Sequence, residues 1–389
     1  MTRQLAADGG TPAFPEGLPL VRPTFDDVDR VVTELRDALE TGQLTNGPRV
    51  AELEERLSQR LGVHVVAVGS CTAGLMLVYQ ALRVRGDVVM PSHTFSASAH
   101  AVAWAGGRPR FADVEDSRAT LDPKSVRERL DGAAAISATH LYGHPAEVED
   151  LEAIAAEAGI PLVFDSAHAL GSMRGDRPIG SCGTAEVFSM SPTKVTPAGE
   201  GGIVATRDES LAEHVRLGRN YGNPGDYNFT FSGLSARMSE LHATLALSSV
   251  RSLDRRLEAR LEAVDQFAAE LAGHAALRVV RPAAQDLSTF KDLTLDVDPD
   301  VIAADRLQAL LRAEGVDSRR YFWPPLHRQD VYRGLSRADE LPGTERVARR
   351  LLTVPLTNGQ TAEVTRRLAA VIIELIGDPS RGDPSAPRK

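Results

Sequence analysis

The pattern of apolar and polar positions divides the chain into parts with different periodicity. Apolar residues recur at helical spacing in two early stretches, 28–39 and 50–61, and Gly42 suits the end of the first helix. From residue 64 the pattern changes to short apolar runs separated by segments of helix length, such as 72–84 and 148–158. The runs lie at residues 65–68, 88–90, 108–111, 133–138, 161–164, 185–190 and 202–205. Alternating strands and helices predict an α/β fold with a mostly parallel central sheet, flanked by helices on both faces.

The last third of the chain has a different pattern. A long helical stretch at 235–271 is expected to join the α/β domain to a smaller domain. A strand near 289–297 and helices near 302–314 and 361–376 predict that this smaller domain is α+β. We therefore expect an N-terminal arm and helix at residues 1–48, a large α/β domain at 49–250, a small C-terminal α+β domain at 251–377 and a disordered tail at 378–389.

Composition and charge exclude several classes of protein. Of the 389 residues, 42% are hydrophobic and 25% are charged, which excludes global disorder. The formal net charge of −9 argues against nucleic-acid binding, which needs a basic surface. With two cysteines, Cys71 and Cys182, we expect neither a disulfide framework nor a metal site. No signal-peptide pattern or bilayer-length apolar run is found, so we expect a cytoplasmic protein without membrane association.

Chemically useful residues follow three of the predicted strands, where parallel sheets bind their ligands. The segment 70–72, Ser-Cys-Thr, opens a helix, and the N–H groups at a helix N-terminus bind anions. Asp165 directly follows one apolar run, and Lys194 lies between proline and glycine residues after another. Each feature also has an ordinary explanation, namely a helix cap, a turn carboxylate and a surface lysine.

Together these residues match the needs of a pyridoxal phosphate (PLP) site. Such a site has a lysine that forms a Schiff base with the cofactor and a carboxylate that keeps the pyridine nitrogen protonated. It also has an anion cradle for the phosphate and a flat group that covers the ring. Lys194, Asp165 and the segment 70–72 supply the first three. Phe95, which is otherwise a core aromatic residue, could supply the fourth.

The sequence resembles the sugar aminotransferases of PLP fold type I, which make amino sugars from nucleotide-linked keto sugars. The resemblance extends from about residue 41 to residue 356 and rests on the order and spacing of several blocks. The blocks are GQLTNGP at 42–48, SCTA at 70–73, PSHTF at 91–95, HLYG at 140–143, DSAHA at 165–169, FSMSPTK at 188–194, EGG at 200–202, RNYG at 219–222, GLSARM at 233–238 and PPLH at 324–327.

The resemblance implies roles for the residues at matching positions. Lys194 is expected to be the Schiff-base lysine and proton carrier, and Asp165 to pair with the pyridinium nitrogen. The other cofactor residues implied are Cys71, Thr72 and Ser189 at the phosphate, Phe95 on the ring, His168 against the cofactor and Ser235 at the phosphate of the partner subunit. The segments that border the substrate pocket contain Tyr221, Arg237, Tyr321 and His327, for which packing and surface roles are the alternative.

Three positions depart from the usual pattern of this family. Cys71 stands where glycine is common, Ser235 stands where asparagine is common, and Lys194 is followed by Val195 and Thr196 where asparagine is frequent. None of these changes removes an atom that the chemistry requires. They indicate a divergent subgroup, whose substrate can differ from the family norm.

The resemblance implies a PLP-dependent aminotransferase and a homodimer with shared active sites. Glutamate or glutamine is expected to leave the cofactor as pyridoxamine 5'-phosphate, and a nucleotide-linked keto sugar then receives the amine. The setting is amino-sugar biosynthesis, with antibiotic pathways as one example. The alternatives are an aminotransferase for a keto-cyclitol and a non-catalytic regulatory protein with the same fold. Related dehydratases replace the lysine with histidine, so Lys194 argues against elimination.

Overall fold

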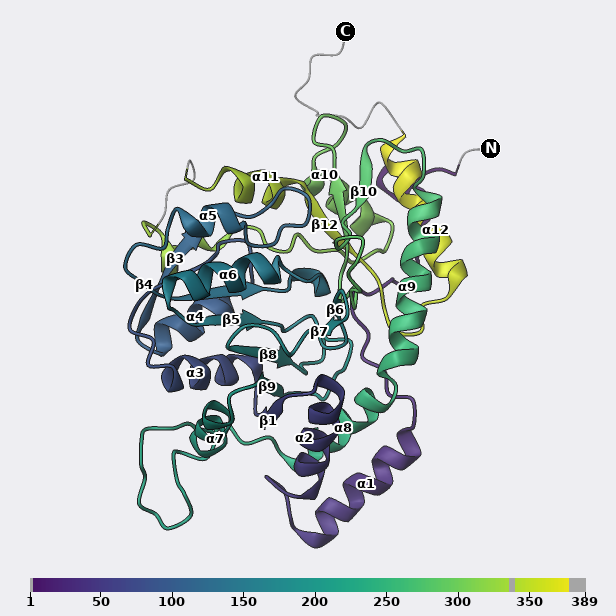
Figure 1. Ribbon diagram of the computed structural model, residues 1–389. Helices are drawn as coiled ribbons and strands as arrows, with labels where there is room; N and C mark the ends of the chain where they lie inside the picture. Colours follow the sequence, from purple (N-terminus) through teal and green to yellow (C-terminus); the bar gives the residue numbers. More distant parts are fainter. Residues whose placement is uncertain (1–2, 336–339, 378–389) are drawn as a thin grey trace.

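A seven-stranded sheet forms the centre of the molecule. The computed structural model describes residues 3–335 and 340–377 (Figure 1). The strands are β1 (His64–Val68), β2 (Gly86–Pro91), β3 (Gly107–Ala112), β4 (Ala133–Thr139), β5 (Leu162–Asp165), β8 (Ala185–Ser189) and β9 (Gly202–Thr206). Their order is β1-β9-β8-β5-β4-β2-β3. β9 runs antiparallel to both neighbours and the other pairings are parallel, so the predicted mostly parallel sheet is confirmed.

Helices cover both faces of this sheet. Successive residues of a strand point to opposite sides, so one strand contributes to the apolar cores on both faces. Val65 and Ala67 of β1 belong to one apolar core with residues of α2 (Pro48–Leu61), α5 (Pro123–Arg127), α6 (Val148–Ala158) and α8 (Glu240–Arg251). Val66 and Val68 belong to another with residues of α3 (Cys71–Ala81), α4 (Ser96–Trp104) and α7 (Glu209–Gly218). The alternation along β1 therefore separates the two faces. The helix α1 (Val28–Thr41) lies against α8, and Gly42 ends it as predicted.

The stretch 235–271, predicted as one long helix, forms two helices instead. α8 begins only at Glu240, where the Ser239 hydroxyl oxygen accepts a hydrogen bond from the N–H of His242 at 3.1 Å. The second helix, α9 (Leu253–Glu270), begins after Ser252, whose φ of −99° and ψ of 3° are not helical. The Ser252 hydroxyl donates to the carbonyl of Ser248 at 3.1 Å, and serine hydroxyls often compete with the backbone in this way.

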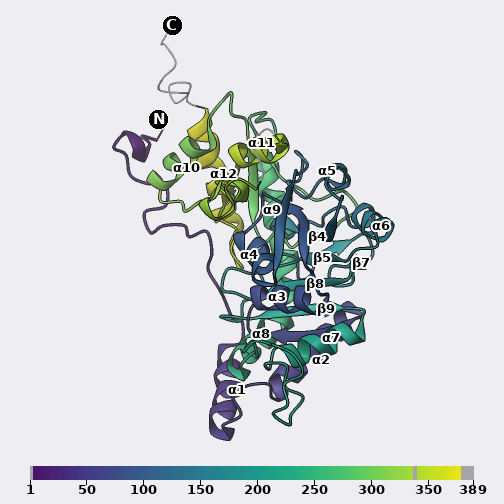
Figure 2. The same cartoon turned by 90° about the vertical axis from the view of Figure 1, so that its left-hand side faces the viewer.

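A second sheet and its helices follow α9. The antiparallel strands are β10 (Leu277–Val279), β11 (Leu293–Val297) and β12 (Leu351–Val354), and the helices are α10 (Ala304–Ala313), α11 (Pro342–Arg350) and α12 (Ala362–Ile376). Their core includes Val264 and Phe267 of α9, and Leu5 and Phe14 from the start of the chain. Figure 1 shows α9 running from α8 to this sheet, and Figure 2 shows the N-terminal segment passing down the molecule to α1.

The remaining elements are short. They are the strands β6 (Met173–Arg174) and β7 (Arg177–Pro178) and single 3-10 turns at Ala6–Asp8, Leu141–Gly143, Leu326–Arg328 and Asp330–Tyr332. Within residues 3–335 and 340–377, none of the helices combines the length and the apolar character that a membrane span requires. The tail predicted at 378–389 lies outside the described residues, and the domain limits stay a prediction.

Candidate active site

A cavity of about 440 Å³ opens at one edge of the seven-stranded sheet. Six of the seven strands run in the same direction, and the carboxyl ends of five of them, β1, β2, β4, β5 and β8, meet at this edge, where β9 begins. The lining contains residues that directly follow these strands, as expected for a ligand site of a parallel sheet. Of the twelve site residues predicted from the sequence, the lining includes eight, namely Cys71, Thr72, Phe95, Asp165, His168, Ser189, Lys194 and Tyr321.

The N-terminus of α3 contributes part of the cavity wall. The Ser70 hydroxyl oxygen caps this helix by accepting a hydrogen bond from the N–H of Ala73 at 3.1 Å. Glycine is required at 202, because a Cβ there would lie 2.5 Å from the backbone nitrogen of Cys71. The first turn of α3 and Ser189 line the same cavity, where the helix dipole and the N–H groups favour a bound anion.

Asp165 is a buried carboxylate at the end of β5. Its side chain is held from two sides, because the Ser98 hydroxyl donates to Oδ2 at 2.5 Å and the N–H of Ala167 donates to Oδ1 at 3.1 Å. The Cys71 thiol lies 3.9 Å from Oδ1. Burial, reinforced by the Asp165 charge, raises the pKa of Cys71 well above its usual value, so this thiol stays protonated. Cys71 is therefore a small uncharged group beside the carboxylate and not a nucleophile.

Lys194 follows β8 in a tight turn, in which its N–H donates to the carbonyl of Ser191 at 3.0 Å. Burial and then the charge of Lys291 lower the pKa of Lys194 to about 8, from an ordinary value of 10.5. Near neutral pH, Lys194 is therefore a neutral amine in a larger fraction of the molecules than a lysine in water would be. A neutral amine is the form that accepts a proton or acts as a nucleophile.

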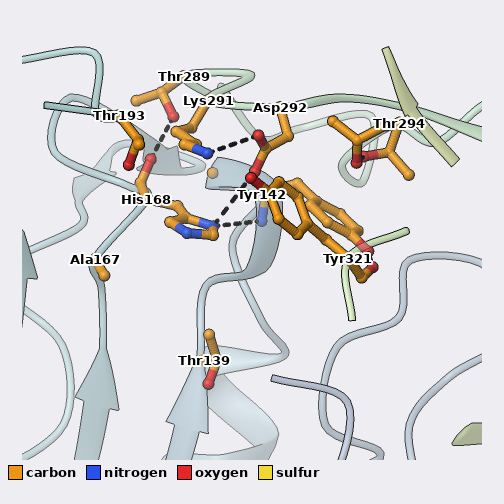
Figure 3. A network of polar contacts seen from close by, with 12 residues as sticks. Thr139, Tyr142, Ala167, His168, Thr193, Thr289, Lys291, Asp292, Thr294 and Tyr321 are labelled. Atoms are coloured by element: carbon orange, nitrogen blue, oxygen red, sulfur yellow. Dashed lines mark hydrogen bonds and ion pairs between the residues drawn. The ribbon is translucent and has the colours of Figure 1, made fainter. Parts of the chain in front are cut away.

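His168 is a neutral imidazole in this site. The N–H of Tyr142 donates to His168 Nδ1 at 3.2 Å, so the hydrogen-bond network assigns the ring proton to Nε2 (Figure 3). Burial, with added repulsion from Lys194 and Lys291, lowers the pKa of His168 well below its usual value. Nδ1 also lies 3.8 Å from Asp292 Oδ2, but an acceptor nitrogen makes no ion pair with a carboxylate. His168 can therefore donate a hydrogen bond from Nε2.

Lys291 and Asp292 are part of the site that was not predicted from the sequence. Lys291 lines the cavity, and its ammonium group donates to Asp292 Oδ1 at 2.7 Å (Figure 3). The small number of lysines in the sequence could have indicated Lys291 as a site residue. The chain's 44 basic residues include four lysines, Lys124, Lys194, Lys291 and Lys389, against forty arginines. In a chain that uses arginine on its surface, an internal lysine is an unusual choice, and two of the four line one cavity.

Aromatic rings form another part of the wall. Phe95 is 58% exposed although it is large and apolar. Its ring centroid lies 5.9 Å from that of Phe322, and Phe322 lies 5.1 Å from the ring of Tyr321. The hydroxyl of Tyr142 donates to the carbonyl of Tyr321 and so ties this segment to the end of β4. An exposed flat ring at the wall of a cavity is suited to cover a flat ligand.

Four predicted site residues lie outside the lining. Tyr221, Ser235 and Arg237 form a separate cluster, in which the Arg237 guanidinium lies 5.2 Å from the Tyr221 ring centroid and donates to the Ser235 hydroxyl at 3.3 Å. His327 is buried behind the cavity wall. Its Nδ1 lies 2.7 Å from the Ser92 hydroxyl oxygen, and its Nε2 lies 2.9 Å from a carboxylate oxygen of Glu345.

Comparison with known proteins gives consistent matches over almost the whole chain. A family model described as the DegT/DnrJ/EryC1/StrS aminotransferase family matches residues 26–372. A UDP-N-acetyl-3-dehydro-alpha-D-glucosamine 3-aminotransferase of Acidithiobacillus ferrooxidans is 30% identical over 349 residues, 88% of this chain and 93% of that protein. A dTDP-4-amino-4,6-dideoxy-D-glucose transaminase of Shigella dysenteriae is 25% identical over 360 residues, 92% of this chain and 98% of that protein. DesI, solved in the presence of its TDP-sugar product, has a TM-score of 0.90 at 36% identity and 95% coverage of both chains.

Proposed function

Because the chain belongs to the DegT/DnrJ/EryC1/StrS aminotransferase family, we propose that it transfers an amino group from glutamate or glutamine to a nucleotide-linked keto sugar. The protein is a PLP-dependent aminotransferase. The keto-sugar acceptor is supported by the names of two relatives, which aminate dTDP- and UDP-linked sugars, and by DesI with its TDP-sugar product. The observation that carries the proposal is the meeting of Lys194, Asp165 and the N-terminus of α3 in one cavity.

The residues of the cavity fit PLP. Lys194 offers an amine of lowered pKa, Asp165 offers a buried carboxylate for the pyridine nitrogen, and the first turn of α3 with Ser189 offers a phosphate site. The backbone at residue 202 lies so close to Cys71 that a Cβ there would collide with the first turn of α3. Glycine at 202 therefore keeps this turn accessible. When bound, PLP supplies an electron sink for the negative charge left on carbon after a proton is removed.

Lys194 is the group that moves the proton in the proposed reaction. With a pKa of about 8, about a tenth of its side chains are neutral at pH 7, compared with well under a thousandth for an ordinary lysine. Its Nζ accepts the proton from the substrate carbon in one direction and returns it in the other. The Lys291 ammonium repels a proton on Lys194 and so favours the basic form.

Asp165 and His168 orient the site without moving protons. Asp165 stays fixed because Ser98 and the N–H of Ala167 hold both of its oxygens. His168, with its proton on Nε2, presents a neutral donor and adds no positive charge beside Lys194. Phe95, with its exposed ring, is proposed to cover the cofactor and exclude water from one face.

A homodimer with shared sites is part of the same proposal. Tyr221, Ser235 and Arg237 contact one another on the surface and not in the chain's own cavity. A cluster of this kind is free to complete the site of a second copy, as the family resemblance implies for Ser235. We also propose domain limits near residues 48 and 250, since two apolar cores adjoin along α9, and a reducing cytoplasmic location, since Cys71 and Cys182 are both free.

The test is spectroscopic and uses the purified protein with PLP. We expect a visible absorption band from the lysine-bound cofactor, which L-glutamate converts to the pyridoxamine form. A panel of nucleotide-linked keto sugars should then restore the band, with a free keto-cyclitol as the comparison. The absence of any visible band would contradict the assignment of Lys194. Restoration by the cyclitol alone would contradict the nucleotide-linked substrate, and a monomer in sedimentation analysis would contradict the shared site.

A further inference from the structure

Lys291 is a buried cation that the proposed chemistry leaves with unused hydrogen-bond donors. Its side chain is 3% exposed, yet it lines the cavity. Burying an ammonium group is unfavourable unless it is paired, and Asp292 Oδ1, at 2.7 Å, provides the pairing. An ammonium group has three N–H donors. Within the described part of the chain Asp292 is its one hydrogen-bond acceptor, so two donors remain for a ligand.

The position of Lys291 is fixed by contacts on several sides. Its ammonium nitrogen lies 5.3 Å from the Tyr321 ring centroid, a favourable cation–π distance. Two residues earlier, the Thr289 hydroxyl donates to the carbonyl of His168 at 2.6 Å and joins the segment to the cavity wall (Figure 3). Asp292 Oδ2 has no hydrogen-bond partner within the described residues, so Lys291 is the one side chain there that donates a hydrogen bond to this carboxylate. Lys291 and Asp292 therefore form a rigid pair, which comes from the segment before β11. The pair is separate from the first turn of α3, which is the proposed phosphate site.

The charge of the cavity suggests which ligand group Lys291 meets. Among the described lining residues the lysines are Lys194 and Lys291, and there is no arginine. Lys194 is needed as an amine, and His168 is neutral because its Nδ1 accepts a hydrogen bond. An amino-acid donor carries a carboxylate one bond from the carbon that bears its amine. When that amine lies next to Lys194, the donor carboxylate lies within a few ångströms of the amine, inside the same cavity. A cation at that place would bind the carboxylate favourably.

We propose that Lys291, held by Asp292, binds a carboxylate of the amino-acid donor. The proposal rests on the proposed function and deepens it by naming the group that recognises the donor. A keto sugar has no carboxylate at its reacting carbon. Lys291 is therefore expected to contribute to the binding of the amino acid and not to the binding of the sugar nucleotide. Loss of its charge weakens the binding of the amino acid and leaves the binding of the sugar nucleotide unchanged.

The experiment measures the binding of glutarate, a dicarboxylate without an amino group, to the PLP-loaded protein by isothermal titration calorimetry. A hydrogen bond to a charged group contributes enough that Lys291→Met should weaken glutarate binding about ten- to hundredfold. Lys291→Arg keeps the charge and should recover part of the affinity. Lys124→Met removes the same charge from α5, outside the cavity lining, and should bind glutarate like the wild type.

A second variant guards against misfolding, because Lys291→Met leaves the Asp292 carboxylate buried without a partner. The double variant Lys291→Met/Asp292→Asn removes both charges together and should show the same loss of glutarate affinity. Equal affinity of the wild type and the double variant would overturn the proposal, as would a wild type that does not bind glutarate. An equal loss of affinity in Lys124→Met would also overturn it, since long-range charge alone would then explain the effect.

The sugar half of the reaction keeps this proposal distinct from the proposed function. The pyridoxamine-loaded protein should bind a nucleotide-linked sugar with the same affinity in the wild type and in Lys291→Met. A parallel loss of sugar affinity would overturn the separation of the two ligands. If no keto sugar is aminated while glutarate binding depends on Lys291, the proposed acceptor fails and the donor site stands.

Discussion

Two walls of the cavity have different structural origins. The sheet wall, which comprises residues 70–72, Asp165, Ser189 and Lys194, comes from strand ends and the turns that follow them. The second wall, which comprises Lys291, Tyr321 and Phe322, comes from segments that pack beside the smaller sheet. Parallel strands place their ends together in any such fold, whereas the second wall depends on how the later part of the chain packs onto it. We therefore expect changes in the sheet wall to remove chemistry and changes at the second wall to alter binding.

The largest effect is expected from Lys194→Ala in the sheet wall. The variant loses the group proposed to carry the proton, so the rate of the glutamate half-reaction should fall by at least about 10³-fold. The measurement is single-turnover absorbance of the PLP-loaded protein mixed with L-glutamate. Lys124→Ala, at an exposed position of α5 outside the cavity lining, is the matched control and should react like the wild type. A Lys194→Ala protein that folds normally and reacts at the wild-type rate would remove Lys194 from the mechanism.

The same residue should destabilise the cofactor-free protein. The pKa of Lys194 is about 8 in the folded protein and 10.5 in the unfolded chain, so the unfolded chain binds more protons between these values. The free energy of unfolding therefore rises with pH through this window, and below pH 8 the folded protein bears the full penalty of a buried charge. The penalty is up to about 3 kcal/mol, an upper value because Lys194 faces the open cavity, where water screens its charge.

Urea unfolding of the cofactor-free wild type and Lys194→Met checks this sign. At pH 7 we expect the variant to be more stable, and its advantage should shrink as the pH rises from 8 to 10. Lys124→Met should show no such trend. An advantage that does not change with pH would indicate that methionine only packs better, and that the charge of Lys194 is not destabilising.

Asp165→Asn tests the electrostatic part of the sheet wall. Asparagine keeps an oxygen for the Ser98 hydroxyl, which lies 2.5 Å from Oδ2, but it removes the negative charge proposed to hold the proton on the pyridine nitrogen. The rate of the glutamate half-reaction should fall about ten- to hundredfold, as for the loss of a charged hydrogen-bond partner. Ser98→Ala, which loosens Asp165 and keeps its charge, should have a smaller effect. A larger loss in Ser98→Ala than in Asp165→Asn would mean that the orientation of this side chain matters more than its charge.

The same contrast explains what the sequence could predict. Lys194, Asp165 and Phe95 could be found because each follows an apolar run by a few positions, and strand ends are local features. Lys291 lies inside the stretch 289–297 that was predicted as a strand, whereas β11 begins only at Leu293. Nothing local shows that the residues before Leu293 turn toward a cavity whose sheet wall is formed by residues 70–194.

The structure of the later part of the chain was predicted less completely for the same reason. β10 has three residues and β12 has four, too few for a periodic signal, and each is held by its pairing with β11. Ser252 separates α8 from α9 within the long helical stretch predicted at 235–271, and no proline or glycine marks the break. Tertiary pairing therefore determines β10 and β12, and a serine hydroxyl bonded to the backbone accompanies the break between the two helices.

The smallest effect is expected behind the second wall, at His327. This side chain connects the Ser92 hydroxyl, 2.7 Å from its Nδ1, with Glu345, 2.9 Å from its Nε2, and so fastens the segment after Phe322 to the end of β2. His327→Gln should keep one of these contacts and lower the free energy of unfolding by about 1 kcal/mol. His327→Leu should lose both and cost about 2 kcal/mol, because two side-chain hydrogen bonds are removed while Glu345 keeps Arg328 and the Ser92 hydroxyl keeps the backbone N–H of residue 327.

The kinetics of the His327 variants test whether the second wall contributes to ligand binding alone or also to the chemistry. If His327 only holds the second wall, kcat should stay within about twofold while KM for the amino donor rises a few-fold, because a loosened wall binds less well and the proton carrier is untouched. The measurement is steady-state kinetics of His327→Gln below its unfolding temperature, with Ser92→Ala as the control that loosens the same contact from the other side. A large loss of kcat in His327→Gln alone, at normal stability and with Ser92→Ala unaffected, would place His327 against the substrate and join the second wall to the chemistry.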